Sequence, residues 1–155
     1  MTEHKQLRRL DTVWVTPAIY FVTICAKDRR PIMANFGTVA ILRQEFAAAR
    51  ERHGWRIGRF VVMPDHVHFF CMSDERRDAS SLSRFVGAIK EWTAKQMVAC
   101  GARPPIWQKQ FFDHLLRSDE SYANKWTYVH ENPVRAGLVA KAEDWPHAGE
   151  IEALE

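Results

Sequence analysis

The sequence predicts an α+β fold of the ferredoxin-like type, a sandwich in which a mainly antiparallel β-sheet carries helices packed on one face. The first observation is the expected element order, β, α, β, β, α, β, α, which contains two halves of β-α-β type. The second is composition: 155 residues, 46% of them apolar, with only 7 Gly and 7 Pro, suffice for one hydrophobic core. This composition excludes disordered, collagen-like and low-complexity classes.

The first half of the chain shows a strand, a helix and two further extended runs. Residues 20–26 alternate β-forming side chains and predict a strand. Thr38 is a candidate N-cap for a helix that ends at His53-Gly54. Two extended runs follow, residues 55–63 and 66–72, and Pro64-Asp65 between them favours a hairpin or a kinked continuation.

The second half supplies two helices and one strand. Ser81 opens a helix with an apolar stripe, which ends in the segment 100–105. Residues 106–116 read as a strand, and Ser118-Asp119 are expected to cap a third helix from about Glu120. No internal repeat, linker or second domain is evident. We therefore expect a single domain, 1–155, with its core at about 9–146 and an acidic C-terminal tail, 140–155.

Cysteine usage and hydropathy bear on the compartment. The three cysteines are far apart and form no C-x-x-C pair, so neither a disulfide framework nor a thiolate zinc site is indicated. The apolar stretch 13–26 superficially resembles a signal peptide, but Asp11 and Pro17 and its β-branched residues favour a strand. No apolar run approaches the roughly 20 residues of a membrane-spanning helix. We expect a cytoplasmic protein with no membrane partner.

The charge is unevenly distributed. The net charge is +3, but residues 1–135 contain 21 bases and 14 acids, so this body is +7 while the C-terminal segment is acidic. A basic body favours a polyanionic partner such as nucleic acid, although an excess of this size is also a common solubility feature.

Two histidines form an H-x-H pair. His66 and His68 are two residues apart on an expected strand, so both imidazoles project from one face of the sheet. They can share one metal ion if a third ligand exists. The alternative is a pair of half-buried histidines without a ligand, which is common at alternate strand positions.

The third helix offers candidate partners for that pair. Its core stripe should be Tyr122, Trp126 and Val129, which turns Tyr128 onto a polar strip with Lys125 and Asn132. Tyr128 is either a candidate nucleophile or a surface tyrosine with a hydrogen-bond partner. Asn132 is either a ligand or only the N-cap of a short turn that begins at Pro133, because the third helix should end near Glu131.

Taken together, four motifs resemble those of the REP-associated tyrosine transposases, relatives of the insertion-sequence 200-type transposases among the HUH single-strand endonucleases. They occur in the family's order, and the resemblance as a whole covers about Arg9 to Pro146. The matching text is YFVTICAKDRRP at 20–31, VMPDHVH at 62–68, FFDH at 111–114 and YVxxNPVRAGLV at 128–139.

The resemblance implies an enzyme and assigns roles to these residues. His66 and His68 would be the HUH pair, Asn132 the third metal-binding side chain and Tyr128 the nucleophile. The ion would be Mg²⁺ or Mn²⁺; by ligand chemistry alone two imidazoles favour Mn²⁺, and Zn²⁺ stays open. The enzyme would cleave and rejoin DNA through a covalent 5′-phosphotyrosine, which retains the bond energy and needs no ATP.

The implied partner is single-stranded or hairpin DNA of the REP type, at repetitive extragenic palindromes. An unpaired strand can bend around a sheet and stack bases on aromatics such as Trp14, Tyr20 or Trp107, although most such rings should be core. In the family the N-terminal region helps to read a tetranucleotide beside the hairpin. The candidate DNA-binding cations are Arg8, Arg9, Lys27, Arg29, Arg30, Lys125 and Arg135.

Two departures from the family pattern stand out. Asp65 replaces a common Asn, and a carboxylate beside the HUH pair can either tighten the metal or repel the phosphate. His147-Ala148-Gly149 replaces a serine-rich segment after Trp145-Pro146.

Two other functions are open from the sequence. One is a non-catalytic, regulatory DNA-hairpin-binding module on the same fold; the other is a small hydrolytic metalloenzyme that does not need Tyr128. Both a monomer and a homodimer are compatible with one nucleophilic tyrosine per chain.

Overall fold

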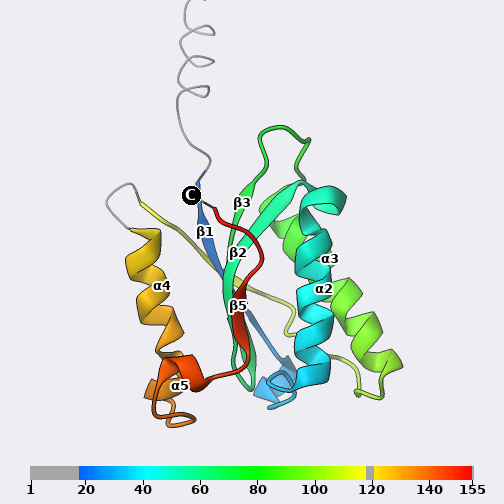
Figure 1. Ribbon diagram of the computed structural model, residues 1–155. Helices are drawn as coiled ribbons and strands as arrows, with labels where there is room; N and C mark the ends of the chain where they lie inside the picture. The colour runs from blue at the N-terminus through cyan, green and yellow to red at the C-terminus, as the bar shows by residue number, and fades with distance from the viewer. Residues whose placement is uncertain (1–17, 118–120, 155) are drawn as a thin grey trace, which may run out of the picture.

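The computed structural model describes residues 18–117 and 121–154, and Arg8, Arg9, Trp14 and Ser118-Asp119 lie outside them. The chain forms an α+β fold, which confirms the predicted class. Its elements, labelled as in Figure 1, are β1 (Tyr20–Cys25), the 3-10 helix η1 (Lys27–Arg29), α2 (Phe36–His53), β2 (Trp55–Val62), β3 (His66–Ser73), α3 (Leu82–Ala99), β4 (Phe112–Leu115), α4 (Tyr122–His130), α5 (Asn132–Arg135), the 3-10 helix η2 (Ala142–Asp144) and β5 (Ala148–Glu150).

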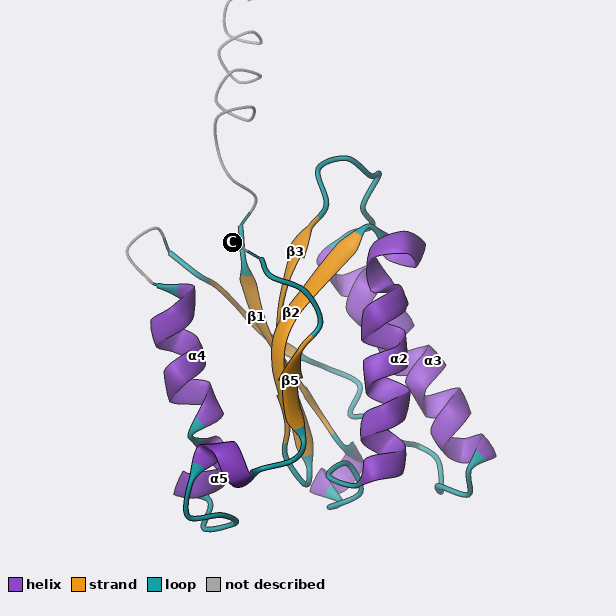
Figure 2. Cartoon of the chain, viewed as in Figure 1, coloured by secondary structure: helices purple, strands orange, loops and turns teal. Residues whose placement is uncertain are grey.

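The sheet has five strands in the order β4-β1-β3-β2-β5, and every neighbouring pair is antiparallel. Pro64-Asp65 form the turn of the β2–β3 hairpin, as one of the two expected alternatives. Helices α2 and α3 cover one face, whereas α4 packs on the other (Figure 2). The expectation that all helices pack on one face is therefore wrong for α4.

The alternation of side chains along β3 explains why both faces are covered. Val67 and Phe69 point into the larger cluster under α2 and α3 and are fully buried. Phe70 and Met72 point to the opposite side, into a second apolar cluster with Tyr122 and Val129 of α4. His66 and His68 follow the same alternation as Phe70. They therefore project from the face on which α4 lies.

The helix termini follow capping chemistry at positions partly different from those predicted. Asn35, not Thr38, caps α2, because its side chain accepts a hydrogen bond from the Thr38 amide at 2.9 Å. Gly54 ends α2 in the left-handed conformation, and Ser81 caps α3, both as predicted. Ser121 caps α4, which begins at Tyr122, later than expected. Over the described ranges, no helix is long and apolar enough to cross a membrane.

Strand β4 is shorter than the strand predicted over residues 106–116. Trp107 joins Ala26 only through an isolated bridge, and its indole Nε1 donates to Thr93 Oγ1 at 3.0 Å inside the core. The segment before β4 therefore leaves the sheet because Trp107 packs against α3. At the start of β4, Phe111, the residue before the strand, packs towards the core, and Phe112, its first residue, is exposed.

The acidic C-terminal segment is an integral part of the sheet rather than a loose extension. Strand β5 pairs with β2, and His147 and Leu154 are buried. Glu152 accepts hydrogen bonds from Arg50 and Arg56, at 3.1 and 2.8 Å. The negative charge of this segment is therefore partly neutralised by arginines of α2 and β2.

Gly58 allows α4 to approach the sheet closely, which leads to a stability prediction. A Cβ at this position would meet the Tyr122 hydroxyl at 2.4 Å and Leu154 Cδ1 at 2.6 Å. We expect Gly58→Ala to lower the free energy of unfolding by about 1–3 kcal/mol through overpacking. The measurement is chemical denaturation.

Gly87→Ala is the matched control for that prediction. Gly87 is exposed on α3 and an added Cβ meets nothing within 4 Å, so this change should be neutral or stabilise the protein by up to about 1 kcal/mol. Equal stability of the two variants would contradict the close approach.

Candidate active site

The turn of the β2–β3 hairpin fixes the position of the histidine pair. Its backbone carbonyls accept hydrogen bonds from the segment that follows β1: the Ala26 amide donates to Asp65 O and the Met33 amide to Pro64 O, each at 2.9 Å. Trp145 Nε1 donates to Val62 O at 3.0 Å. Trp145 therefore stabilises the end of the hairpin, and the turn is held by segments that are distant in sequence.

The two imidazoles lie against each other, and each has one ring nitrogen engaged. The ring centroids of His66 and His68 are 4.6 Å apart. Nδ1 of His66 is 2.7 Å from Asp65 Oδ1, and Nδ1 of His68 is 2.8 Å from Thr23 Oγ1. Such partners fix the orientation and tautomer of a metal-binding histidine. Within the part of the chain that the structure describes, the Nε2 atoms are available to a ligand.

His68 is held neutral by its surroundings. Burial lowers the pKa of His68 to about 3, and the charges of His66, Lys125, Arg29 and Arg135 act in the same direction. Because only the neutral imidazole has a lone pair for a metal, this environment keeps His68 competent as a ligand.

Asp65 orients the His66 ring, and Arg29 neutralises the charge of the Asp65 carboxylate. Although burial opposes the shift, hydrogen bonds from Arg29 and His66 lower the pKa of Asp65. Arg29 Nε lies 2.8 Å from Asp65 Oδ2. Asp28 and Arg29 both adopt positive φ, 56° and 53°, a strained conformation for residues other than glycine. This strained turn brings Arg29 back to the hairpin and offsets the carboxylate that would otherwise repel a phosphate.

The donor set fits a divalent metal that accepts imidazole nitrogen. Two oriented imidazoles on one sheet face, one of them kept neutral, suit Mn²⁺ or Zn²⁺ better than Mg²⁺. Within residues 18–117 and 121–154, no group of three or more His, Cys, Asp or Glu is placed to hold a metal by itself. A third protein ligand would therefore have to be of another type, such as the amide oxygen of Asn132.

Tyr128 projects from α4 with its side chain accessible. It is 62% exposed, whereas Tyr122 and Val129 of the same helix are buried, as the predicted stripe requires. Arg135 Cζ lies 4.0 Å from the centroid of the Tyr128 ring and Lys125 Nζ lies 5.9 Å from it. A phosphate that approached this phenol would therefore meet two cations.

Asn132 does not cap a helix. It is the first residue of α5, whose N-cap position is Glu131, and α4 ends at His130 close to the predicted point. The Asn132 Oδ1 accepts a hydrogen bond from Arg135 Nη2, which also donates to the Tyr128 carbonyl at 2.7 Å. Arg135 thereby ties Asn132 to the end of α4 that carries Tyr128.

Phe21 lies between the histidine pair and the polar strip of α4 that carries Tyr128 and Lys125. The Phe21 ring stacks on His68 with a centroid distance of 5.0 Å, and Lys125 Nζ lies 5.1 Å from the Phe21 centroid. In the described part of the chain, Tyr128 makes no direct hydrogen bond or ring contact with either imidazole. The histidine pair and the Tyr128 strip thus share one sheet face and are bridged by an aromatic and a cation.

The other candidate DNA-binding residues are placed less centrally. Lys27 lines a shallow surface hollow next to η1, and Arg30 donates to the carbonyls of Lys27 and Pro105. Trp107 is buried, and Tyr20 is half-buried against Trp55. The expectation that Tyr20 or Trp107 stacks on a base is therefore not supported, because both rings pack in the core.

Phe21 and Thr23 are site residues that the sequence analysis missed. Thr23 pairs with His68 in the β1–β3 register, which places its hydroxyl beside the imidazole. Both residues lie within the first strand at alternate positions, which marks a common face but not the strand that pairs with it. Only knowledge of the pairing could have found them.

Comparisons with known proteins agree with this geometry. Residues 15–132 match the model of a family described as IS200-like transposases. A REP-associated tyrosine transposase of Escherichia coli strain K12 is 29% identical over 133 residues, 86% of this chain and 76% of that protein. A Haemophilus influenzae protein described as a candidate of the same kind is 26% identical over 140 residues, 84% of this chain and 78% of its own length.

A solved structure supports the same resemblance. It shows a REP-associated tyrosine transposase bound to a REP hairpin, with a TM-score of 0.70 and 26% identity, and the match covers 86% of this chain and 77% of that one. The resemblance drawn from the sequence motifs is thus confirmed.

Proposed function

This chain belongs to the family of IS200-like transposases, and from that premise we propose that it cleaves and rejoins single-stranded or hairpin DNA of the REP type. The observation that carries the proposal is the shared sheet face: two oriented imidazoles and an exposed phenol flanked by cations, joined through Phe21 and Lys125. The structural relative bound to a REP hairpin supports the choice of DNA.

The proposed reaction is a phosphoryl transfer to tyrosine. The Tyr128 oxygen attacks the phosphorus, an O–P bond forms, and the bond to the 3′ oxygen breaks. The proton lost by the phenol is balanced by the proton that the released 3′-OH gains. Attack by a free 3′-OH on the phosphotyrosine reverses these changes and rejoins a strand without ATP, because the phosphate is never hydrolysed.

Each residue of the site has a proposed task. His66, His68 and Asn132 would hold a divalent ion, Mg²⁺ or Mn²⁺, of which the imidazole donors favour Mn²⁺, and the ion would supply charge neutralisation at the phosphate. Asp65 and Thr23 orient the imidazoles. Arg135 and Lys125 attract the phosphate towards the phenol. Asn132 would have to share its oxygen with Arg135 or release it.

Covalent capture tests this function. The protein is incubated with a labelled hairpin oligonucleotide and Mn²⁺, then run on a denaturing gel. We expect a protein–DNA adduct that forms with Mn²⁺ and is absent when EDTA is added first. An adduct that forms equally well in EDTA would contradict metal dependence, and cleavage without an adduct would point to hydrolysis.

Two observations favour a second candidate, a non-catalytic module that binds DNA hairpins. The Asn132 oxygen is already occupied by Arg135, and the phenol does not touch the imidazoles in the described chain. Such a module would bind hairpin DNA with a steep dependence on salt yet give no adduct with any divalent ion. The capture experiment separates the two. In either case we expect a cytoplasmic protein. A measurement of its mass in solution distinguishes a monomer from a homodimer.

A further inference from the structure

The face of the sheet that carries the histidine pair continues across β1 to the edge strand β4. Phe112 opens this strand and is 61% exposed. Its neighbour Phe111 packs towards the core on the opposite side. A single exposed aromatic is common on protein surfaces, so its position relative to the site decides whether it matters.

Strand registers place Phe112 in one row with the site. Phe112 pairs with Thr23 across β4 and β1, and Thr23 pairs with His68 across β1 and β3. Paired residues of antiparallel strands point to the same face, and the hydrogen bond between Thr23 and His68 confirms this side. Two strand spacings separate Phe112 from His68, roughly 10 Å.

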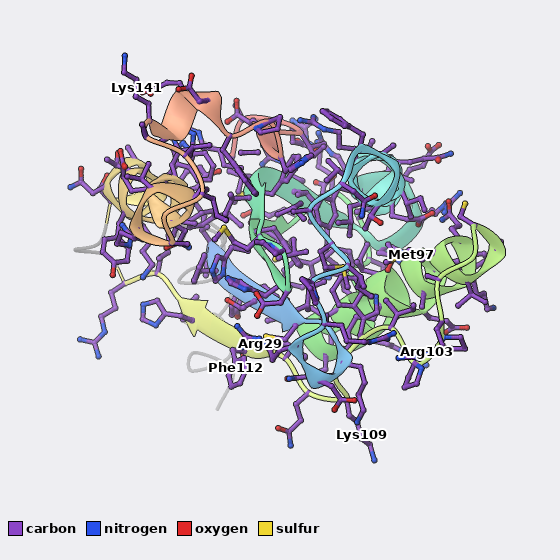
Figure 3. All side chains as sticks on the ribbon, turned by 90° about the horizontal axis from the view of Figure 1, so that it is seen from below. Arg29, Met97, Arg103, Lys109, Phe112 and Lys141 are labelled. Carbon is purple, nitrogen blue, oxygen red and sulfur yellow. The ribbon has the colours of Figure 1, made fainter. Side chains whose placement is uncertain are left out.

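The segment that leads to Phe112 is held in place and carries positive charge. Lys90 Nζ donates to the carbonyls of Lys109 and Gln110, at 3.1 and 3.4 Å. A surface hollow next to this segment is lined by Lys27, Asp28, Gln108, Lys109 and Gln110. In the view from below, Arg29, Phe112 and Lys109 lie along the same border of the molecule, away from Lys141 (Figure 3).

We propose that Phe112 is a stacking platform for one nucleobase of the single strand that flanks the scissile phosphate. The inference rests on the proposed function and adds a base-binding position to it. A strand held at His68 crosses the sheet over Thr23, lays one base on the exposed ring, and passes its backbone to the hollow with Lys27 and Lys109. An aromatic face accepts any base, so this contact gives affinity rather than sequence recognition.

The experiment measures binding rather than cleavage, so it does not depend on the covalent chemistry. All variants carry Tyr128→Phe, and the probes are hairpin oligonucleotides with single-stranded flanks. An abasic site is placed at each flanking position in turn. We expect Phe112→Ala to weaken binding of the intact probe by about 5- to 150-fold, and Phe112→Trp to restore it.

In the protein that retains Phe112, an abasic site at one position should weaken binding as much as Phe112→Ala does. In the Phe112→Ala variant, the same abasic site should weaken binding little further. This non-additivity identifies the stacked base. Leu115→Ala is the matched control, because Leu115 is 46% exposed on the same strand but on the opposite face, and it should bind normally.

Three results would overturn the proposal. The first is normal binding by Phe112→Ala. The second is a loss of affinity from the abasic site that adds fully to the loss from Phe112→Ala at every position. The third is a dimer that forms without DNA and dissociates in Phe112→Ala, which would assign the ring to a contact between two copies. If no covalent adduct forms in the capture experiment but one abasic position still shows the non-additive loss with Phe112→Ala, the covalent chemistry is rejected and the base-stacking proposal stands.

Discussion

Tyr128→Phe is expected to eliminate the covalent protein–DNA adduct while changing the affinity for hairpin DNA by no more than about twofold. The change removes only the oxygen that would form the bond to phosphorus. The ring stays, and with it the contacts to Arg135 and Lys125, so the attraction for the phosphate is kept. Denaturing gels measure the adduct, and fluorescence anisotropy measures the affinity.

Tyr20→Phe is the matched control for that loss. Tyr20 is half-buried against Trp55 in the core and does not reach the site, so this variant should form the adduct at the normal level. Because Tyr128 is exposed, its replacement should leave thermal unfolding unchanged. An adduct that persists in Tyr128→Phe would remove this residue from the role of nucleophile and return the choice to the binding module or a hydrolase.

His68→Ala is expected to abolish measurable Mn²⁺ binding and, with it, adduct formation. One of the two proposed imidazole ligands would be lost, which would leave His66 and Asn132 as the remaining proposed ligands. The readout is the electron paramagnetic resonance signal of free Mn²⁺, which falls when the ion binds and does not require activity. His68→Gln serves as a larger replacement, because His68 stacks on Phe21 and its removal leaves a gap.

Thr23→Val should weaken Mn²⁺ binding without abolishing it. Threonine and valine have similar shapes, but valine cannot hydrogen-bond to Nδ1 of His68. Loss of such an orienting partner typically weakens metal binding about 10- to 100-fold. His53→Ala, at the end of α2 on the opposite side of the sheet, should bind Mn²⁺ normally. Unaltered Mn²⁺ binding by His68→Ala would show that the ion, if bound, lies elsewhere.

The elements that carry a local signal were predicted well. The alternation in β1 and β3, the stripe of Tyr122 and Val129, and the stop at Gly54 each depend on neighbours within a few residues. The strand predicted at 106–116 was too long, because Trp107 turns into the core to meet Thr93, a residue of another helix. The same kind of non-local contact placed α4 on the second face.

The sequence by itself determined the fold class and the family, and it singled out the residues that we propose to bear the chemistry: His66, His68 and Tyr128 are visible because their types and spacing are local properties of the chain. Only the tertiary structure decided what surrounds them. The registers of β1 with β3 and β4 bring Thr23 beside His68 and place Phe112 in the same row, and the contact of Lys125 with Phe21 joins the two halves of the site. Such registers depend on hydrogen bonds between segments that are distant in sequence, so periodicity within a single strand cannot specify them.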